Sequence, residues 1–197
     1  MGKDRKFLLH GILFYLFIFT MKPEIISTED IYKGKIFDLY EAEIRDGDVR
    51  YKREIVKHKG SAVIIPVFAD ETVALVKQYR HAAETYLLEI PAGTLNLSED
   101  PQTGARRELE EEIGVTANKI EKLTEFYVSP GFLTEKMHLY LATELTETAQ
   151  NLEEDEILSI VKISFPEAFE KIRNGEIQDA KTIIGLILAG ARFGFPY

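Results

Sequence analysis

The sequence predicts an α+β fold, in which a mixed β-sheet carries helices on either side. Turn signals divide most of the chain between residues 31 and 163 into short runs rich in β-branched and aromatic side chains, which is typical of strands. Helical patterns occur over residues 101–113 and twice more after residue 163. The chain has 197 residues, of which 45% are hydrophobic, and we find neither an internal repeat nor a low-complexity linker. It is long enough for one main domain with a sizeable core.

The first strands are expected before residue 60. Residues 31–40 mix β-branched and aromatic side chains, and the turn signal Arg45-Asp46-Gly47-Asp48 should close a hairpin onto residues 49–58. Residues 61–68 form a near-continuous apolar run, which predicts a strand buried on both faces. Further strands are expected at residues 72–78, 86–90, 120–128, 136–143 and 157–163. We therefore separate an N-terminal strand region, residues 21–60, from the main domain, residues 61–197.

Residues 1–20 need a separate explanation. A basic stretch, residues 3–6, precedes an apolar run at residues 7–19, which is shorter than the roughly 20 residues of a membrane span. The pattern resembles a secretory signal, but residues 19–22 lack the small-x-small cleavage pattern. Residues following Met21 look like an ordinary cytosolic start. We expect residues 1–20 to be a dispensable or mis-assigned extension, with a membrane anchor and a cleaved signal as the alternatives.

Two helices are predicted after residue 163. Ser164 and Glu167 fit a capping box that opens a helix ending near Arg173, before Asn174-Gly175. Asp179 can cap a last helix. Its apolar face against the sheet should be formed by Ile183, Ile184, Ile187 and Leu188.

The most informative helix lies within residues 93–115, which read GTLNLSEDPQTGARRELEEEIGV. Asp100-Pro101 is a helix start signal and Gly114 a natural stop. At about 100° per residue, the side chains of Glu108, Glu111 and Glu112 fall within roughly a 100° arc, and Glu110 points nearly opposite. Carboxylates that share a face repel one another, and hard divalent cations relieve the repulsion. Mg²⁺ is the expected cation, with Mn²⁺ as a plausible substitute.

A solvated, glutamate-rich surface is the alternative explanation of this helix. Against it, no glutamate of the run has a lysine four residues further on, so the face does not neutralise itself. The preceding Pro91-Ala92-Gly93 also lets the backbone come close to a bound ion.

Composition excludes several other classes of site. The net charge of −9 and the lack of a basic stripe argue against general nucleic-acid binding. The chain has no cysteine, which excludes disulfides and thiolate zinc sites and suits the cytoplasm. The histidines are scattered without metal-binding spacing and are expected to be surface or packing residues: His10, His58, His81 and His138.

Residues 93–115 resemble the Nudix box, G-x5-E-x7-R-E-U-x-E-E-x-G-U with U aliphatic, at every fixed position. Residues 89–93 before the box, and Ser129-Pro130-Gly131 after it, resemble the ADP-ribose pyrophosphatase branch of that family. The resemblance implies a Nudix-type α/β/α sandwich with an N-terminal antiparallel strand region. It also implies Mg²⁺-dependent hydrolysis of ADP-ribose to AMP and ribose 5-phosphate. In this branch the N-terminal strands pack across a homodimer and complete the partner's site.

The resemblance also implies roles for individual residues. Metal ligands would be Glu108, Glu111 and Glu112 with the Ala92 carbonyl, and Arg107 and Glu99 would brace the loop and helix that carry them. The general base would come from an acidic loop at residues 153–158, with Glu154 first and Glu156 as its alternative. Substrate-binding positions would be Arg53, Arg80, Pro130 and Glu135. The aromatic residue that stacks on adenine in this branch has no clear counterpart near Gly34, which leaves base selectivity open.

Two other functions stay open from the sequence. The same box serves hydrolases of other nucleotide sugars, such as GDP-mannose. A non-catalytic nucleotide sensor on the same fold is the third possibility, although such a module has no need to keep every carboxylate.

Overall fold

The computed structural model describes residues 22–152, 154 and 156–197. The expectations for residues 1–20, whether extension, anchor or signal, fall outside these residues. In the part of the chain that is described, no helix has the length and apolar character needed to cross a membrane.

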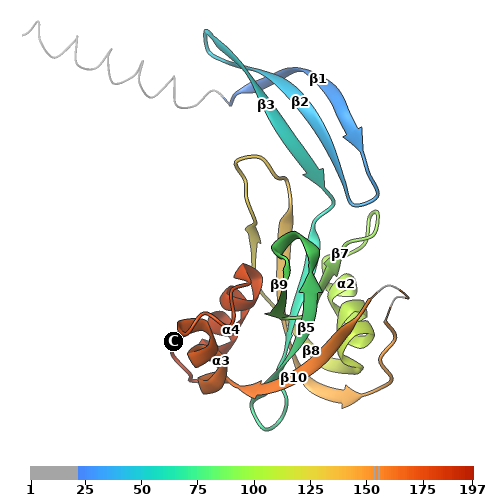
Figure 1. Cartoon of the computed structure of the whole chain (residues 1–197), viewed down its shortest axis with the longest axis vertical. Coiled ribbons are helices and arrows are strands. Elements are labelled where there is room, and N and C mark those ends of the chain that lie inside the picture. Colours follow the sequence, from blue (N-terminus) through green and yellow to red (C-terminus); the bar gives the residue numbers. More distant parts are fainter. Residues whose placement is uncertain (1–21, 153, 155) are drawn as a thin grey trace, which may run out of the picture. The chain divides into compact units, whose positions relative to one another are not determined.

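The chain divides into two compact units (Figure 1). The first unit contains the described residues up to His58 together with Ser129–Thr134. The second unit contains Lys59–Val128 and Glu135–Tyr197. The loop from Ser129 to Thr134 thus belongs with the N-terminal strands, although the sequence places it in the main domain.

The first unit is an antiparallel sheet of three strands in the order β1-β2-β3. Its strands are β1 (Glu24–Lys33), β2 (Phe37–Asp46) and β3 (Val49–His58). The predicted hairpin at Gly47 is confirmed, because Asp46 pairs with Val49 and Gly47 has a positive φ of 60°. The continuous strand expected over residues 31–40 is wrong. The chain turns at Gly34, where a Cβ would lie 2.6 Å from the Tyr32 ring, so a residue with a side chain would not fit without rearrangement.

The second unit contains two sheets. One has the order β7-β4-β9-β8, with β4 parallel to β9, and the other has the order β10-β5-β6. In the second sheet, β5 pairs antiparallel with both β10 and β6. The bounds are β4 (Ser61–Pro66), β5 (Thr72–Arg80), β6 (Thr85–Glu89), β7 (Ala92–Thr94), β8 (Val115–Tyr127), β9 (Lys136–Glu147) and β10 (Leu158–Ser164), with a 3₁₀ turn, η1, at His81–Ala83.

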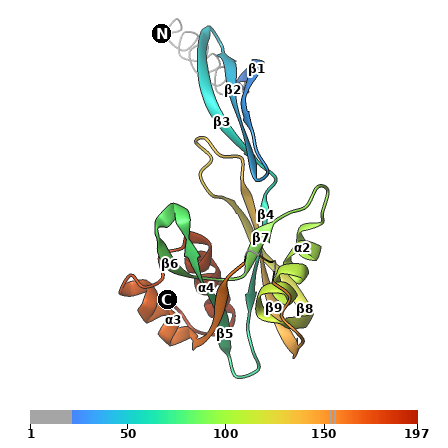
Figure 2. The same cartoon turned by 45° about the vertical axis from the view of Figure 1, so that its right-hand side comes forward.

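Side chains of β4 pack alternately into two hydrophobic cores. Every residue of β4 is buried, as its apolar sequence predicts. Val63 and Ile65 pack in the core that includes α3 (Phe165–Arg173) and α4 (Ala180–Arg192). Ala62 and Ile64 pack in the core that includes α2 (Pro101–Glu108). Helices therefore cover opposite faces of the strands, as Figure 2 shows for α2 against α3 and α4.

The helix starts agree with the predicted caps. The side chains of Asp100, Ser164 and Asp179 accept hydrogen bonds from the backbone three residues further on. The glutamate-rich helix ends at Gly114, in the left-handed conformation, but its last turn is a π-helix, η2 (Leu109–Ile113).

The predicted apolar face of α4 is confirmed only in part: Ile183 and Ile184 pack against the core, whereas Ile187 and Leu188 are not among the residues that do so. Ile183, Ile184 and Ile187 are only partly buried and Leu188 is 38% exposed. The deepest positions carry small or polar side chains and one leucine: Lys181, Thr182, Gly185, Leu186, Ala189 and Gly190. At Gly185 a Cβ would lie 2.6 Å from Ile90 Cδ1, so the close approach of the helix to this strand end depends on a residue without a side chain.

Candidate active site

Three glutamates lie where α2 passes into η2. Glu108 and Glu112 are buried, at 7% and 4% exposed, and Glu111 is partly buried. Glu110, which the helical spacing places on the opposite side, is exposed. The sequence thus folds two carboxylates into the protein interior and leaves a third at its edge.

Arg107 joins these carboxylates to the loop before the helix. Its Nη1 lies 2.6 Å from Glu108 Oε1 and 2.8 Å from Glu111 Oε2. Its Nε donates to Glu99 Oε1 at 3.1 Å, and the other oxygen of Glu99 accepts from the Asn96 backbone N–H at 2.8 Å. Arg107 and Glu99 therefore brace the loop and the helix against each other.

Gly93 brings the backbone of β7 against Glu108. A Cβ at this position would lie 1.9 Å from Glu108 Oε1, which is closer than atoms can approach. The glycine is needed here for space, since a side chain would displace the carboxylate. Next to it, the Ala92 backbone hydrogen-bonds to Glu112.

The two buried carboxylates resist ionisation. Burial raises the pKa of Glu112 to about 9, helped by the negative charges of Glu108 and Glu156. Burial also raises the pKa of Glu108 to about 7, against the opposing charge of Arg107. A nearby divalent cation would reverse both effects.

The chemistry of the donor atoms, rather than a converged arrangement of them, favours a divalent cation here. Oε2 of Glu112 is buried and has no hydrogen-bond partner among the described residues, which is costly unless a ligand or proton satisfies it. Arg107 holds Glu108 and Glu111 here, and no three His, Cys, Asp or Glu side chains of the described chain converge closely enough to form a metal site. Oxygen donors alone are what Mg²⁺ and Mn²⁺ prefer.

The acidic loop contributes Glu156 to this environment. The charge of Glu156 raises the pKa of both Glu108 and Glu112, so its carboxylate lies near theirs. Glu154 is exposed. A hydrogen bond connects the start of this loop to the helix: Gln150 Nε2 donates to the Glu112 carbonyl at 2.6 Å.

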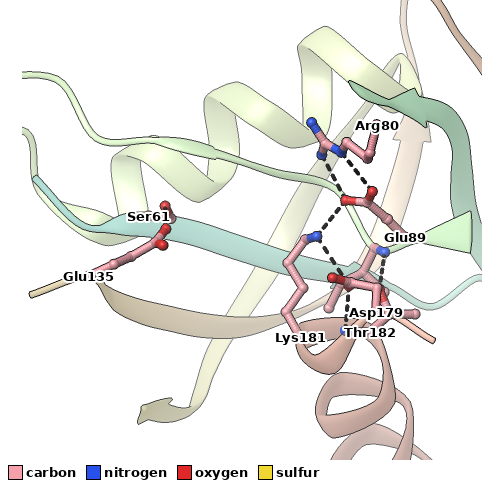
Figure 3. Close-up of polar contacts among 8 residues, drawn as sticks. Ser61, Arg80, Glu89, Glu135, Asp179, Lys181 and Thr182 are labelled. Carbon is pink, nitrogen blue, oxygen red and sulfur yellow. Dashed lines mark hydrogen bonds and ion pairs between the residues drawn. The ribbon is translucent and has the colours of Figure 1, made fainter. Parts of the chain in front are cut away.

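Arg80 approaches the same region from β5. Its Nε and Nη2 donate to the two oxygens of Glu89, both at 2.7 Å (Figure 3). The charge of Glu112 acts on Arg80, which places the guanidinium near the carboxylates of the helix. Arg80 is 42% exposed and so is accessible to a ligand.

The other predicted substrate residues lie elsewhere in the chain. Arg53 and Pro130 belong to the first unit and are both exposed. The guanidinium of Arg53 stacks over the Tyr51 ring at 4.4 Å. Glu135 belongs to the second unit, where its Oε1 accepts a hydrogen bond from Ser61 Oγ at 2.6 Å (Figure 3).

Glu89 and Lys181 are charged residues whose role is not predictable from the sequence. Both are buried, and Lys181 Nζ lies 2.5 Å from Glu89 Oε2. A weak signal exists for each: Glu89 is a lone acid in the apolar stretch 87–91, and Lys181 is the only charge in residues 180–191. Their pairing is not visible in the sequence, because 92 positions separate them.

Known proteins resemble this chain in sequence. A family model described as NUDIX domain matches residues 57–184. The ADP-ribose pyrophosphatase of Bacillus subtilis (strain 168) is 41% identical over 167 residues, covering 83% of this chain and 90% of that protein. The methanol dehydrogenase activator of Bacillus methanolicus is 39% identical, with coverage of 84% and 91%. The GDP-mannose pyrophosphatase of Cronobacter sakazakii (strain ATCC BAA-894) is 36% identical, with coverage of 74% and 81%.

A solved structure gives the same fold. The crystal structure of an ADP compounds hydrolase superposes with a TM-score of 0.77, at 22% identity, covering 88% of this chain and 95% of that one. This confirms the predicted α+β sandwich with mixed and antiparallel strands.

Proposed function

Because the chain belongs to the Nudix hydrolase family, we propose that it hydrolyses the diphosphate linkage of ADP-ribose, giving AMP and ribose 5-phosphate. The observation that carries the proposal is the buried pair Glu108 and Glu112 beside Glu111, with Oε2 of Glu112 left without a hydrogen-bond partner in the described part of the chain. The 41% identity to an ADP-ribose pyrophosphatase supports the choice of substrate. A non-catalytic sensor would have no use for the complete set of carboxylates.

We propose that Glu108, Glu111, Glu112 and the Ala92 carbonyl hold Mg²⁺, with Mn²⁺ able to substitute. When bound, the cation would neutralise substrate charge and favour ionisation of water near the diphosphate. Its positive charge would also stabilise ionised Glu108 and Glu112 and so offset the burial that raises their pKa. Arg107 would keep Glu108 and Glu111 oriented throughout.

A general base completes the reaction. Hydrolysis forms a bond between a water oxygen and phosphorus and breaks the bond from phosphorus to the bridging oxygen. The attacking water must lose a proton. A carboxylate close to the carboxylate cluster, formed by Glu108, Glu111 and Glu112, can accept it. We propose Glu156 as this base because its charge acts on Glu108 and Glu112, with Glu154 as the alternative.

Two arginines are proposed to bind the substrate. Arg80 presents its guanidinium beside the carboxylate cluster and suits the diphosphate, since arginine binds phosphate oxygens through paired N–H groups. Arg53, in the first unit, is the candidate for the nucleotide, and Pro130 and Glu135 are the remaining candidates for substrate contacts.

GDP-mannose is the second candidate substrate, because a relative 36% identical to this chain is named as a GDP-mannose pyrophosphatase. Purified protein would be incubated with ADP-ribose, ADP-glucose and GDP-mannose, with and without Mg²⁺, and the products separated by chromatography. We expect AMP and ribose 5-phosphate from ADP-ribose, only when Mg²⁺ is present. If GDP-mannose were cleaved and ADP-ribose left intact, the second candidate would replace the first.

We further propose that the protein is a cytoplasmic homodimer that does not bind nucleic acid. Absence of cysteine fits a reducing compartment, and the net charge of −9 disfavours nucleic-acid phosphates. Support for the dimer comes from the first unit, whose strands expose apolar side chains on a sheet that buries few of its residues.

A further inference from the structure

A buried ion network lies behind Arg80. Glu89 is 1% exposed and contacts two positively charged side chains, Arg80 on one side and Lys181 on the other (Figure 3). Lys181 is itself 7% exposed and also lies 3.1 Å from Asp179 Oδ2. Burial alone would raise the pKa of Glu89, but the hydrogen bond from Arg80 and the charge of Lys181 outweigh it and hold the pKa below its usual value.

The network is anchored to rigid elements at both ends. Glu89 ends β6, and Lys181 lies in the first turn of α4. Thr182, the next residue of that helix, accepts a hydrogen bond from the Ile90 backbone N–H at 2.8 Å. The helix start and the strand end are therefore held together directly beside the Lys181–Glu89 contact, which restricts the movement of both side chains.

Stability does not explain why charged residues occupy these positions. Taking Glu89 and Lys181 out of water is unfavourable, and buried ion pairs replaced by well-packed apolar residues often leave a protein as stable as before. A role in orienting Arg80 explains them better. Glu89 engages Nε and Nη2 of Arg80, which fixes the plane of the guanidinium and leaves its Nη1 end for another partner.

We propose that Lys181 is a positioning residue: it fixes Glu89, and Glu89 in turn fixes the guanidinium of Arg80 beside the carboxylate cluster, where a diphosphate would bind. Placement of the diphosphate there rests on the proposed function. Without Lys181, Glu89 would keep a single, partly exposed partner and could rotate with it. Arg80 would then have to be ordered by the substrate itself, which costs binding energy.

The test replaces Lys181 with methionine, which keeps the length and apolar body of the side chain. We expect Lys181→Met to lower kcat/KM by about 10-fold, within the range of one charge-assisted hydrogen bond. In an Arg80→Ala background the same replacement should cause no further loss, because Lys181 acts only through Arg80. Lys171→Met is the matched control: Lys171, on α3, pairs at 2.8 Å with Glu176 in the turn after that helix, and its loss should leave kcat/KM unchanged.

Other outcomes decide against the idea. If Lys181→Met lowered kcat/KM equally in the wild-type and the Arg80→Ala backgrounds, Lys181 would act on stability or by another route. If Lys181→Met fails to fold, Glu89→Gln combined with Lys181→Met removes both buried charges and keeps similar shapes. This folded double variant should show the same loss, and wild-type kcat/KM in it would refute the proposal. An inert wild-type enzyme would instead refute the proposed function, and the same comparison would then be made on ADP-ribose affinity by calorimetry.

Discussion

At pH values where an ordinary glutamate is ionised, Glu112 retains its proton, because burial raises its pKa to about 9. The folded state of the metal-free protein thus holds protons that the unfolded chain releases near pH 4.5. Stability should therefore fall as the pH rises between these two values. We expect the free energy of unfolding in EDTA to be a few kcal/mol lower at pH 9 than at pH 6.

Chemical denaturation at a series of pH values measures this dependence, and Glu112→Gln separates the part due to Glu112. A neutral glutamine should flatten the decline, because it has no proton to lose. Adding Mg²⁺ to the wild type should raise stability, and more at pH 9 than at pH 6, since the cation competes with protons for the same oxygens. An equal decline in wild type and Glu112→Gln would show that other groups cause it.

The charge of Glu156 acts on Glu108 and Glu112, whereas Glu154 is exposed, so the glutamine variants of the two residues form a matched pair. Glu156→Gln should lower kcat by roughly 10²–10⁴-fold, as loss of a general base does, with little change in melting temperature. Glu154→Gln should leave kcat close to the wild-type value, because Glu154 is exposed. Steady-state kinetics at saturating substrate and Mg²⁺ would measure both. The reverse pattern would assign the base to Glu154.

At the scale of elements, local signals in the sequence were sufficient to predict the helix starts. Asp100, Ser164 and Asp179 each cap the helix they were expected to cap, because an N-cap bond spans only three residues. Burial of β4 on both faces was also predictable, since nearly all of its residues are apolar. Placement of Glu108, Glu111 and Glu112 on one side followed from helical geometry, although the π-turn at residues 109–113 was not predicted.

Packing between distant elements was not predictable in the same way. The helix α4 is apolar on most of its circumference, so hydrophobicity alone does not identify the buried face. Gly185 and Gly190 decide it, because each allows a neighbour to approach where a Cβ would lie 2.6 Å from another side chain. The pair Glu89 and Lys181 was missed for a related reason: nothing local to either residue indicates its partner.

The first unit has too little core to be stable alone. Among its described residues only Ala42 is buried, and the sheet exposes apolar side chains at Ile25, Ile26, Ile31, Tyr32, Ile36, Phe37 and Val49. A three-stranded sheet needs a hydrophobic face packed against something to be stable in water. Exposed apolar surface of this extent is typical of an interface, and we propose that a second copy of the chain covers it, as the resemblance to the ADP-ribose pyrophosphatase branch implies.

We therefore expect light scattering to give the mass of a dimer, about twice the 22.5 kDa of one chain. Replacing Ile25 and Ile31, at 52% and 54% exposed, by lysine should shift the mass towards the monomer, because it would bury charges in an apolar interface. Leu188→Lys, on α4 at 38% exposed, is the matched control and should leave the mass unchanged. If the partner also completes the site, the monomeric variant should lose activity. A fully active monomer would refute the dimer as the functional form, and Arg53 would then have to act within its own chain or not at all.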